Sequence, residues 1–485
     1  MINFFKNYLV ITVFFLTIII IYTYNLPNAF LLTTDFGRDM YHSLRITQAD
    51  LVLIGPKMNF GGYYAGPYFY YLLAPVLLLS NYSIGAVLYS HAILFSIAVS
   101  FLYITISKKI GVWQATLACL TIVLLPFFVL SARHPSNGYT YFPFLLIFAT
   151  LVFFYSYRSK IAIFLLGVLA GIIVNIHPAS IFPTFFISCY LLYCIKVKKT
   201  FFYFLFGALI TFLPLVAFEI KHGFIMTRDT FINNSLSSYI NSPNKPQLAL
   251  HSNKLISISF YLLDKFKEFT NFNFIGFLVL PFLVIAYQLK TLKEKRKGIF
   301  KQNVFLFICL ILSLSLLFPL MFFHYENHYL FGVMFFISFA SVLIILNSHF
   351  FYVLAIFVLI NIFYFPIGLY KDSDGLVEKI DQAVKYSIEK KLVNKDRGFN
   401  LIRVADAYAK VPTGFEYRFF FRKYGFYPNS EYDYRSAGTL LIFAETPFYD
   451  IDKFKMWATE EFGREYFKDR GVFKMENIII YKISK

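Results

Sequence analysis

Residues 33–45 read TTDFGRDMYHSLR and directly follow the first long apolar run of the chain. If this stretch is helical, its charged and imidazole side chains share one face: Asp35, Arg38, Asp39, His42 and Arg45. Its apolar side chains share another: Phe36, Met40 and Leu44. The pattern predicts an amphipathic helix at a membrane interface, with the polar face toward an aqueous cavity. The alternative is an amphipathic connector whose Asp/Arg pairs neutralise each other.

Composition sets the class of protein around this stretch. The 485 residues are 58% hydrophobic, 21% aromatic and 15% charged, with a mean hydropathy of +0.61. A soluble chain of this length does not have such a composition, so we predict a polytopic membrane protein. The net charge of +18 falls largely between apolar runs. We therefore assign it to membrane topology rather than to nucleic acid. The four cysteines lie inside apolar runs and lack metal-ligand spacing, so we interpret them as packing residues.

Apolar runs of suitable length predict about eleven transmembrane helices. The expected spans are 7–24, 84–107, 112–131, 137–157, 160–177, 179–195, 200–219, 272–289, 302–323, 327–346 and 350–369. Gly and Pro exclude a regular helix before about Pro67, and 67–79 is expected to be a short helix that does not span. The alternative for the first run, a cleaved signal peptide, is disfavoured because no small-residue cleavage site follows it.

The basic residues test this topology. Without a span at 67–79, every basic cluster between the apolar runs falls on one side: Lys108/Lys109, Arg158/Lys160, Lys196–Lys199 and Lys290–Lys301. The positive-inside rule makes that side cytoplasmic. We therefore expect a multi-pass protein of the cytoplasmic membrane with its amino terminus inside and its carboxyl terminus outside.

The opposite, extracytoplasmic side collects polar turns. Besides the 33–45 stretch, it holds Arg133 and Asn137, then His177, the loop 221–271, and the sequence FHYENHY with His324, Glu326 and His328. Any one of these side chains at a helix end is more often a cap or a snorkelling group. Five polar turns on one face favour a site outside the cytoplasm.

Beyond residue 370 the composition becomes mixed and charged. We divide the chain into a membrane domain, 1–370, and an extracytoplasmic α/β domain, 371–485. The latter is expected to have helices in 371–396, 414–426 and 452–463 and strands in 398–406, 437–445 and 476–484. It shows no phosphate loop, metal cluster or nucleophile elbow, so we interpret it as a lid or an acceptor-binding domain. GVLAG at 167–171 is typical of close helix packing.

An acidic motif after the first membrane helix, followed by AGPYFYYLLAP, resembles the GT-C superfamily of glycosyltransferases that use polyprenyl-phosphate sugars. The chain is most similar to the family 39-like branch, with protein O-mannosyltransferases and lipid A aminoarabinose transferases. The similarity covers about residues 1–370. The family motif is typically Asp-Glu followed by Arg, with the first Asp as catalytic base. Asp35 and Arg38 match it, whereas Phe36 replaces the Glu, and Asp39 could supply the second carboxylate.

The resemblance implies a donor that keeps its lipid in the bilayer and its sugar phosphate at the interface. Asp35 would take the proton of an acceptor hydroxyl on a protein, lipid or glycan, and Arg38 would orient it. Arg133, His177 and His328 would stabilise the departing phosphate, and Arg133, Asn137 and His177 also resemble family positions. The candidate substrate-binding set is completed by His42, Asn137, Glu326 and four tyrosines that would stack on a sugar or belong to an aromatic belt: Tyr63, Tyr64, Tyr70 and Tyr71.

Several alternatives stay open. HYENH could hold a divalent metal cation, although we favour Glu326 as a hydrogen-bond partner of the sugar or of Arg133. A flippase or other transporter would place charges near the bilayer midplane and show internal repeats, and neither is visible. A polysaccharide polymerase or ligase would typically place its catalytic loop later in the chain, and a non-enzymatic receptor remains an alternative. The sugar, the acceptor and a mono- or diphosphate donor are not encoded by any pattern in the sequence.

Overall fold

The computed structural model describes residues 2–58, 62–155, 159–195, 200–233, 342, 352–394, 398–405, 413–445, 455–475 and 477–485. The expected spans 272–289, 302–323 and 327–346 lie outside these residues, apart from Val342, and so do Glu326 and His328. The chain forms two compact units. The first comprises residues 1–27, 53–69 and 87–371, and the second comprises residues 28–52, 70–86 and 372–485.

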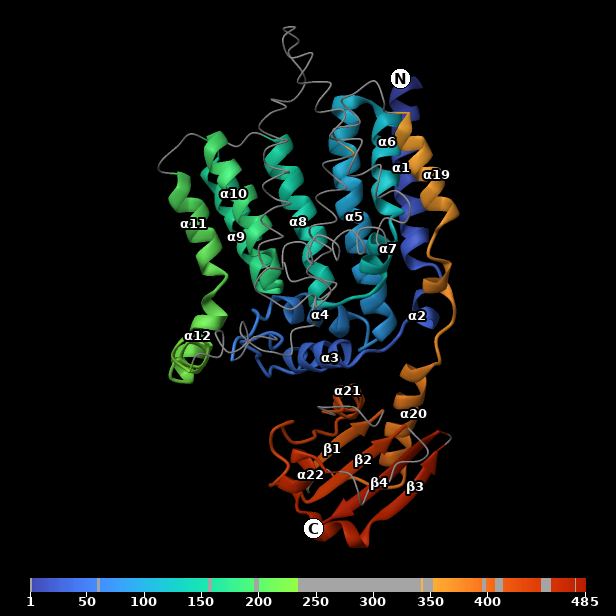
Figure 1. Ribbon diagram of the computed structural model, residues 1–485, viewed down its shortest axis with the longest axis vertical. Helices are drawn as coiled ribbons and strands as arrows, with labels where there is room; N and C mark the ends of the chain where they lie inside the picture. Colours follow the sequence, from blue (N-terminus) through green and yellow to red (C-terminus); the bar gives the residue numbers. More distant parts are fainter. Residues whose placement is uncertain are drawn as a thin grey trace, which may run out of the picture. The chain divides into compact units, whose positions relative to one another are not determined.

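The first unit is helical (Figure 1). Its longer helices are α1 (Ile2–Thr23), α5 (Ile84–Ile110), α6 (Val112–Val123), α7 (Pro126–Arg133), α8 (Asn137–Phe154), α9 (Lys160–Ile176), α10 (Ile181–Ile195), α11 (Thr200–Ile210), α12 (Leu213–Lys221) and α19 (Val353–Phe363). Short elements are α2 (Leu26–Ala29), α13 (Ile225–Thr227), the 3-10 turns Pro178–Ser180 and Ile367–Tyr370, and a π-helical turn at Arg228–Ile232.

Among the described residues, three helical segments are long and apolar enough to cross a membrane: Leu9–Ala29, Ile84–Ile110 and Asn137–Phe154. Two further expected spans, 112–131 and 200–219, are each a bent pair of helices, with bends of 74° and 52°. Pro126 begins α7, and Pro214 lies at the start of α12. Proline lacks the N–H that would continue the preceding helix, which explains why both runs break there. By length and composition, the described part of the chain therefore holds up to five candidate spans.

The GVLAG stretch packs closely, as its small residues predict. A Cβ on Gly167 would lie 2.0 Å from the Phe204 carbonyl oxygen, and one on Gly171 would lie 2.6 Å from that of Ala208. Helices α9 and α11 therefore approach backbone to backbone, which only small residues permit.

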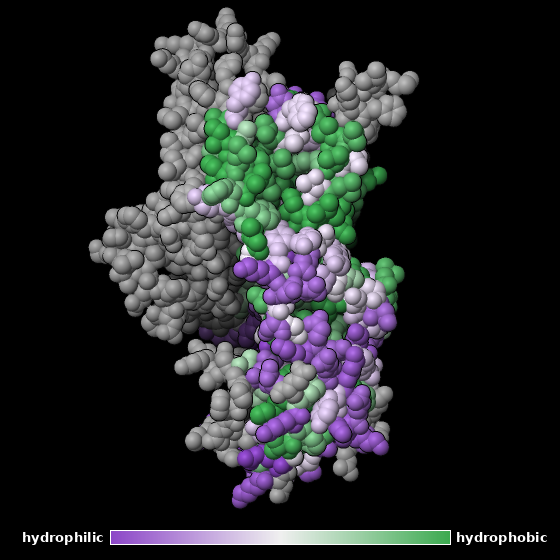
Figure 2. All heavy atoms as spheres, turned by 90° about the vertical axis from the view of Figure 1, so that its right-hand side faces the viewer, coloured by the Kyte–Doolittle hydropathy of each residue, from purple (hydrophilic) through white to green (hydrophobic). Residues whose placement is uncertain are grey.

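Apolar side chains also cover the outside of this unit. Figure 2 shows them gathered over α1 and α19. Along α1 the exposed residues recur at helical spacing: Leu9, Val13, Leu16 and Ile20. On α19 they are Ile356, Leu359, Ile362 and Phe363. The segment Leu9–Ala29, which includes most of α1, is long and apolar enough to cross a membrane, and an exposed apolar face on it fits lipid as its surroundings.

The second unit combines two helices from the amino-terminal part of the chain with an α/β fold from the carboxyl-terminal part. Its elements are α3 (Thr34–Thr47), most of α4 (Tyr68–Leu79), α20 (Leu376–Glu389), β1 (Phe399–Val404), α21 (Phe415–Lys423), β2 (Thr439–Ala444), α22 (Trp457–Phe462), a 3-10 turn (Arg464–Asp469), β3 (Gly471–Met475) and β4 (Ile478–Ser484). The helix expected at 67–79 is α4.

The sheet has the order β1-β2-β4-β3, with β1 parallel to β2 and the other pairs antiparallel. Residues on alternate positions face opposite sides. One side, with Ile402, Ile442 and Ile483, forms a core with Phe462 of α22 and Phe467. On the other side, Phe443 stacks on Tyr417 of α21 with ring centroids 4.1 Å apart. The sheet thus holds α21 on one face.

Two expectations for this unit need correction. The expected strands did not include β3, whose sequence is GVFKM and whose side chains are at most partly buried. The helix expected at 452–463 begins only at Trp457. At its start the Met456 N–H donates to the Thr459 hydroxyl at 3.1 Å, so the residue before the helix has its own N–H satisfied by the first turn.

Candidate functional site

Helix α3 forms where the spacing of its residues predicts, and local chemistry explains its ends. The Thr33 hydroxyl accepts a hydrogen bond from the Phe36 N–H at 3.2 Å, which caps the first turn. Asp35 in the first turn and Arg45 in the last turn complement the helix dipole. The apolar face is buried, since Phe36, Met40 and Leu44 are each at most 1% exposed.

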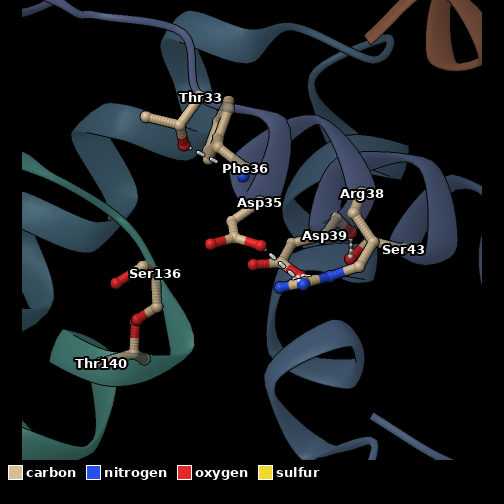
Figure 3. A network of polar contacts seen from close by, with 8 residues as sticks. All are labelled: Thr33, Asp35, Phe36, Arg38, Asp39, Ser43, Ser136 and Thr140. Carbon is tan, nitrogen blue, oxygen red and sulfur yellow. Dashed lines mark hydrogen bonds and ion pairs between the residues drawn. The ribbon is translucent and has the colours of Figure 1, made fainter. Parts of the chain in front are cut away.

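Arg38 lies between two carboxylates of this helix (Figure 3). Its Nη1 donates to Asp35 Oδ1 at 2.7 Å, and its Nε and Nη2 donate to Asp39 Oδ1 at 2.9 and 2.8 Å. A planar guanidinium can make these contacts together, because its donors form a rigid fork. The three charged groups therefore form one cluster.

The two carboxylates of the cluster have opposite surroundings. The Asp35 side chain is 74% exposed, whereas that of Asp39 is fully buried. Burial raises the pKa of Asp39 to about 7, and the neighbouring Arg38 opposes this rise. The expectation that the whole polar face looks into water is thus wrong for Asp39. Of the two, Asp35 is the carboxylate accessible to a substrate.

His42 and Tyr70 pack beside this cluster. The two rings stack with centroids 5.3 Å apart, and Arg45 lies 3.3 Å from His42 Nδ1. Burial, reinforced by Arg45 and Arg38, lowers the pKa of His42 to about 3, so its imidazole is neutral at ordinary pH. Tyr70 is only 1% exposed. In this structure Tyr70 is therefore packed under the cluster, and its predicted stacking on a sugar has no exposed ring face to support it.

The end of α3 carries a second ionic cluster. Arg45 donates to both oxygens of Asp50, at 2.7 and 3.1 Å, and Arg422 of α21 donates to Asp50 at 3.2 Å. The hydrogen bonds from Arg45 lower the pKa of Asp50. Asp50 thereby joins the end of α3 to the α/β fold.

The other predicted tyrosines lie around the turn before α4. Tyr71 donates its hydroxyl to the Val52 carbonyl at 2.7 Å. Tyr64 forms an isolated β-bridge with Lys57, and Tyr63 accepts from the Met58 N–H through its carbonyl. Tyr63 and Tyr64 are partly exposed. Their roles as substrate-binding residues remain predictions.

Arg133 ends α7 in the first unit and is 4% exposed. Its guanidinium donates to the carbonyl oxygens of Tyr22, Tyr24 and Leu369 at 2.9 to 3.2 Å. It also lies over the Tyr370 ring, 3.9 Å from the centroid. These contacts tie the ends of three segments together, so the geometry gives Arg133 a structural role, and its predicted contact with a phosphate remains a prediction.

Asn137 and His177 lie at helix ends in the same unit. Asn137 is the first residue of α8, and His177 ends α9. His177 Nδ1 accepts from the Ala179 N–H at 3.2 Å, and its ring stacks on Tyr141 at 5.7 Å. The capping interpretation of His177 is therefore realised, and its substrate role remains a prediction.

The metal prediction concerned a sequence that the structure does not describe, because His324, Glu326 and His328 lie outside the described residues. Within the described part of the chain, no group of three or more His, Cys, Asp or Glu side chains has an arrangement that could hold a metal ion.

Sequence reasoning missed two residues that contact α3, Glu416 and Arg422. Both lie in a helix that was expected but was treated as part of an independent domain. The available signal was Gly37, since a glycine inside a helix is unfavourable by about 1 kcal/mol and often marks a close approach. A Cβ at Gly37 would lie 2.5 Å from the Glu416 Cγ.

Comparison with known proteins identifies the fold. No family model matches the sequence, and no curated protein matches it. The structure is similar to a crystal structure of ArnT from Cupriavidus metallidurans bound to undecaprenyl phosphate, with a TM-score of 0.60, 9% identity and 97% coverage of both chains. The apo form of that protein gives a TM-score of 0.55 at 8% identity, again with 97% coverage of both chains.

The chain therefore has the GT-C fold, as the resemblance in its sequence predicted. The similarity extends over nearly the full length of both proteins, including residues 371–485, for which the sequence resemblance offered no support. ArnT is a lipid A aminoarabinose transferase. At 9% identity, the likeness establishes the architecture and leaves the chemistry to be argued from the residues.

Proposed function

We propose that this protein is a membrane glycosyltransferase that moves a sugar from a polyprenyl-phosphate donor to an acceptor hydroxyl outside the cytoplasm, with Asp35 as general base. The observation that carries the proposal is the exposed Asp35 carboxylate, held by Arg38 on an interfacial helix of a GT-C fold. The structurally similar ArnT was crystallised with undecaprenyl phosphate, which supports a donor of the polyprenyl-phosphate class.

The chemistry requires a base at the acceptor. As the acceptor oxygen attacks the anomeric carbon, its proton passes to the Asp35 carboxylate. The bond from the anomeric carbon to the phosphate oxygen breaks, and its electron pair leaves with the lipid phosphate. One hydrogen bond from Arg38 to Asp35 Oδ1 orients the carboxylate, and that donor leaves the other oxygen of Asp35 for the acceptor proton.

Asp39 supports this arrangement by holding the Arg38 guanidinium in place. It takes two of the guanidinium donors of Arg38, which fixes the plane of Arg38 and therefore the direction of its third donor toward Asp35. Its own side chain is fully buried and so has no access to an acceptor. We propose Asp39 as a positioning residue, and Arg38 as the residue through which it acts.

The test is transfer of a labelled sugar from a panel of synthetic polyprenyl-phosphate and polyprenyl-diphosphate sugars, using purified protein in lipid. Asp35→Asn should lower transfer or donor hydrolysis by roughly 10²- to 10⁴-fold, the usual contribution of a general base. Folding should be unchanged, because the side chain is mostly exposed. Asp374→Asn is the matched control, since Asp374 is also exposed and accepts a single backbone hydrogen bond.

Two results would contradict the proposal. If the labelled donor crosses the bilayer without being consumed, the protein is a flippase. If Asp35→Asn and Asp374→Asn both retain full turnover, the base lies elsewhere.

A further inference from the structure

Helix α21 of the α/β fold packs directly on α3, the helix that carries the proposed base. Both helices belong to the same compact unit. The Phe415 ring lies 5.8 Å from that of Tyr41 and 5.6 Å from that of His42. A segment nearly 400 residues further along the chain therefore covers one side of the proposed catalytic helix.

The two helices approach closely at Gly37, which lies between Asp35 and Asp39 in the sequence. A Cβ at this position would lie 2.5 Å from Glu416 Cγ and 3.0 Å from the Glu416 backbone nitrogen. Real Cβ atoms do not come so close to another atom, so Gly37 is required by contact with α21. The helix accepts an unfavourable glycine at this point because a larger residue would push the two helices apart.

Glu416 is itself held by the sheet. Its Oε1 accepts from Arg403 Nη1 at 2.5 Å, and its side chain is fully buried. Arg403 of β1 also donates to both oxygens of Glu445, at 2.8 and 2.9 Å. A buried charge that is paired in this way resists displacement, because losing its partner would leave it unpaired in a low-dielectric site. Glu416 is thus held in a fixed position where it contacts α3 at Gly37.

Arg422 forms a second contact, at the other end of α3. It donates through Nε to the Gln48 side chain at 2.5 Å and through Nη2 to Asp50 at 3.2 Å. Asp50 is held in turn by Arg45 of α3. Since Gln48 directly follows the helix, α21 contacts α3 near both of its ends.

We propose that Glu416 and Arg422 are positioning residues that set the orientation of α3, and with it Asp35. This inference rests on the proposed function. It assigns the α/β fold a part in catalysis, where the sequence suggested a lid or an acceptor-binding domain. An isolated helix of 14 residues is marginal in water, so its geometry depends on what it packs against. A displacement of about 1 Å in a catalytic group can lower a rate about 10²-fold.

The main experiment is a double-mutant cycle between Gly37 and Glu416. Gly37→Ala should lower kcat about 10- to 100-fold, because its methyl group displaces α3 from α21. Adding Glu416→Ala removes the Cγ that the methyl group meets. The kcat of the double variant should therefore be at least about tenfold higher than that of Gly37→Ala alone. Glu416→Ala alone leaves Arg403 paired with Glu445.

Arg422→Ala tests the second contact without introducing a new atom. We expect a fall in kcat of about tenfold with the KM for the donor unchanged, because Arg422 contacts α3 rather than substrate. In an Asp35→Asn background the same change should have no further effect on residual turnover, since Arg422 acts through Asp35. Lys423→Ala is the matched control, because Lys423 lies over Phe420 and Tyr424 of its own helix region.

Hydrogen exchange gives a readout that does not depend on activity. Amide exchange in residues 34–47 should become faster in Arg422→Ala and in Gly37→Ala, and should remain as in the wild type in Lys423→Ala. If these variants leave both kcat and exchange unchanged while the wild type transfers sugar, the inference is wrong. Faster exchange in α3 with no transfer or donor hydrolysis by the wild type would instead overturn the proposed function.

Discussion

Arg38 and Arg133 were both expected at an extracytoplasmic site, and the structure gives them different surroundings. Arg38 divides its donors between an exposed carboxylate and a buried one. Arg133 directs its donors to the carbonyl oxygens of Tyr22, Tyr24 and Leu369 and lies against the Tyr370 ring. Arg38 therefore has an accessible carboxylate beside it, Asp35, whereas the donors of Arg133 are taken up by backbone carbonyl oxygens.

The difference teaches how a polar turn at a membrane face can be interpreted. Helix ends leave carbonyl oxygens without partners, and a nearby arginine can satisfy them. Arg133 does this for the end of α1 and for the turn Ile367–Tyr370. In α3, the Thr33 hydroxyl and backbone hydrogen bonds satisfy the helix ends. The Arg38 donors are therefore directed to the carboxylates of Asp35 and Asp39.

The comparison of Arg133 with Arg38 is tested first by Arg133→Ala, for which we expect a large loss of stability. The change leaves buried carbonyl oxygens without donors and removes a ring contact, which should destabilise the protein by about 2–4 kcal/mol. Turnover per folded molecule should stay within about twofold of the wild type. Thermal unfolding in detergent measures the stability, transfer of the labelled sugar measures the turnover, and donor binding is measured beside them. A normal melting temperature with weakened binding would instead support the phosphate role predicted from the sequence.

A pH-dependent effect on stability is expected from the protonation of Asp39. Its pKa in the folded protein is about 7, against an ordinary value near 3.8, so between pH 4 and 7 the folded chain holds a proton that the unfolded chain has released. Stability from this group is therefore highest at pH 4 and falls as the pH rises to 7, by up to about 1.4 kcal/mol per pH unit.

Comparison with Asp39→Asn isolates that contribution. The melting temperature of the wild type minus that of the variant should decrease steadily as the pH rises from 4 to 7. A difference that is constant over this range would mean that Arg38 keeps Asp39 ionised throughout.

A pH effect of the opposite sign is expected from His42. Its pKa is lowered to about 3 in the folded protein from an ordinary value near 6.5. Between these values the unfolded chain binds a proton that the folded chain does not, so stability is complete above pH 6.5 and is lost as the pH falls.

His42→Phe keeps an aromatic ring between Tyr70 and Phe415 and removes the titration. The stability of wild type relative to this variant should therefore rise between pH 4 and 6.5. The reverse slope would show that His42 is protonated within its ring cluster, and would contradict the packing described for α3.

Much of this protein was predictable from local patterns. The spacing of Phe36, Met40 and Leu44 predicted an interfacial helix, and α3 occupies residues 34–47 with that face buried. The glycines of GVLAG predicted a close helix contact, and α9 meets α11 there. The acidic motif predicted a GT-C fold, which the likeness to ArnT confirms. These features follow from periodicity, side-chain size and turn chemistry, which are properties of short segments.

The sequence by itself thus determined a membrane protein with an amphipathic acidic helix and a separate α/β composition after residue 370. Tertiary structure alone decided which carboxylate of that helix is exposed, because Asp35 and Asp39 share one face and differ only in what packs over them. Tertiary structure also brings Glu416 into contact with Gly37. Gly37 marks a close approach within its own segment, but no local pattern names Glu416 as the partner, since that depends on how residues hundreds of positions apart pack together.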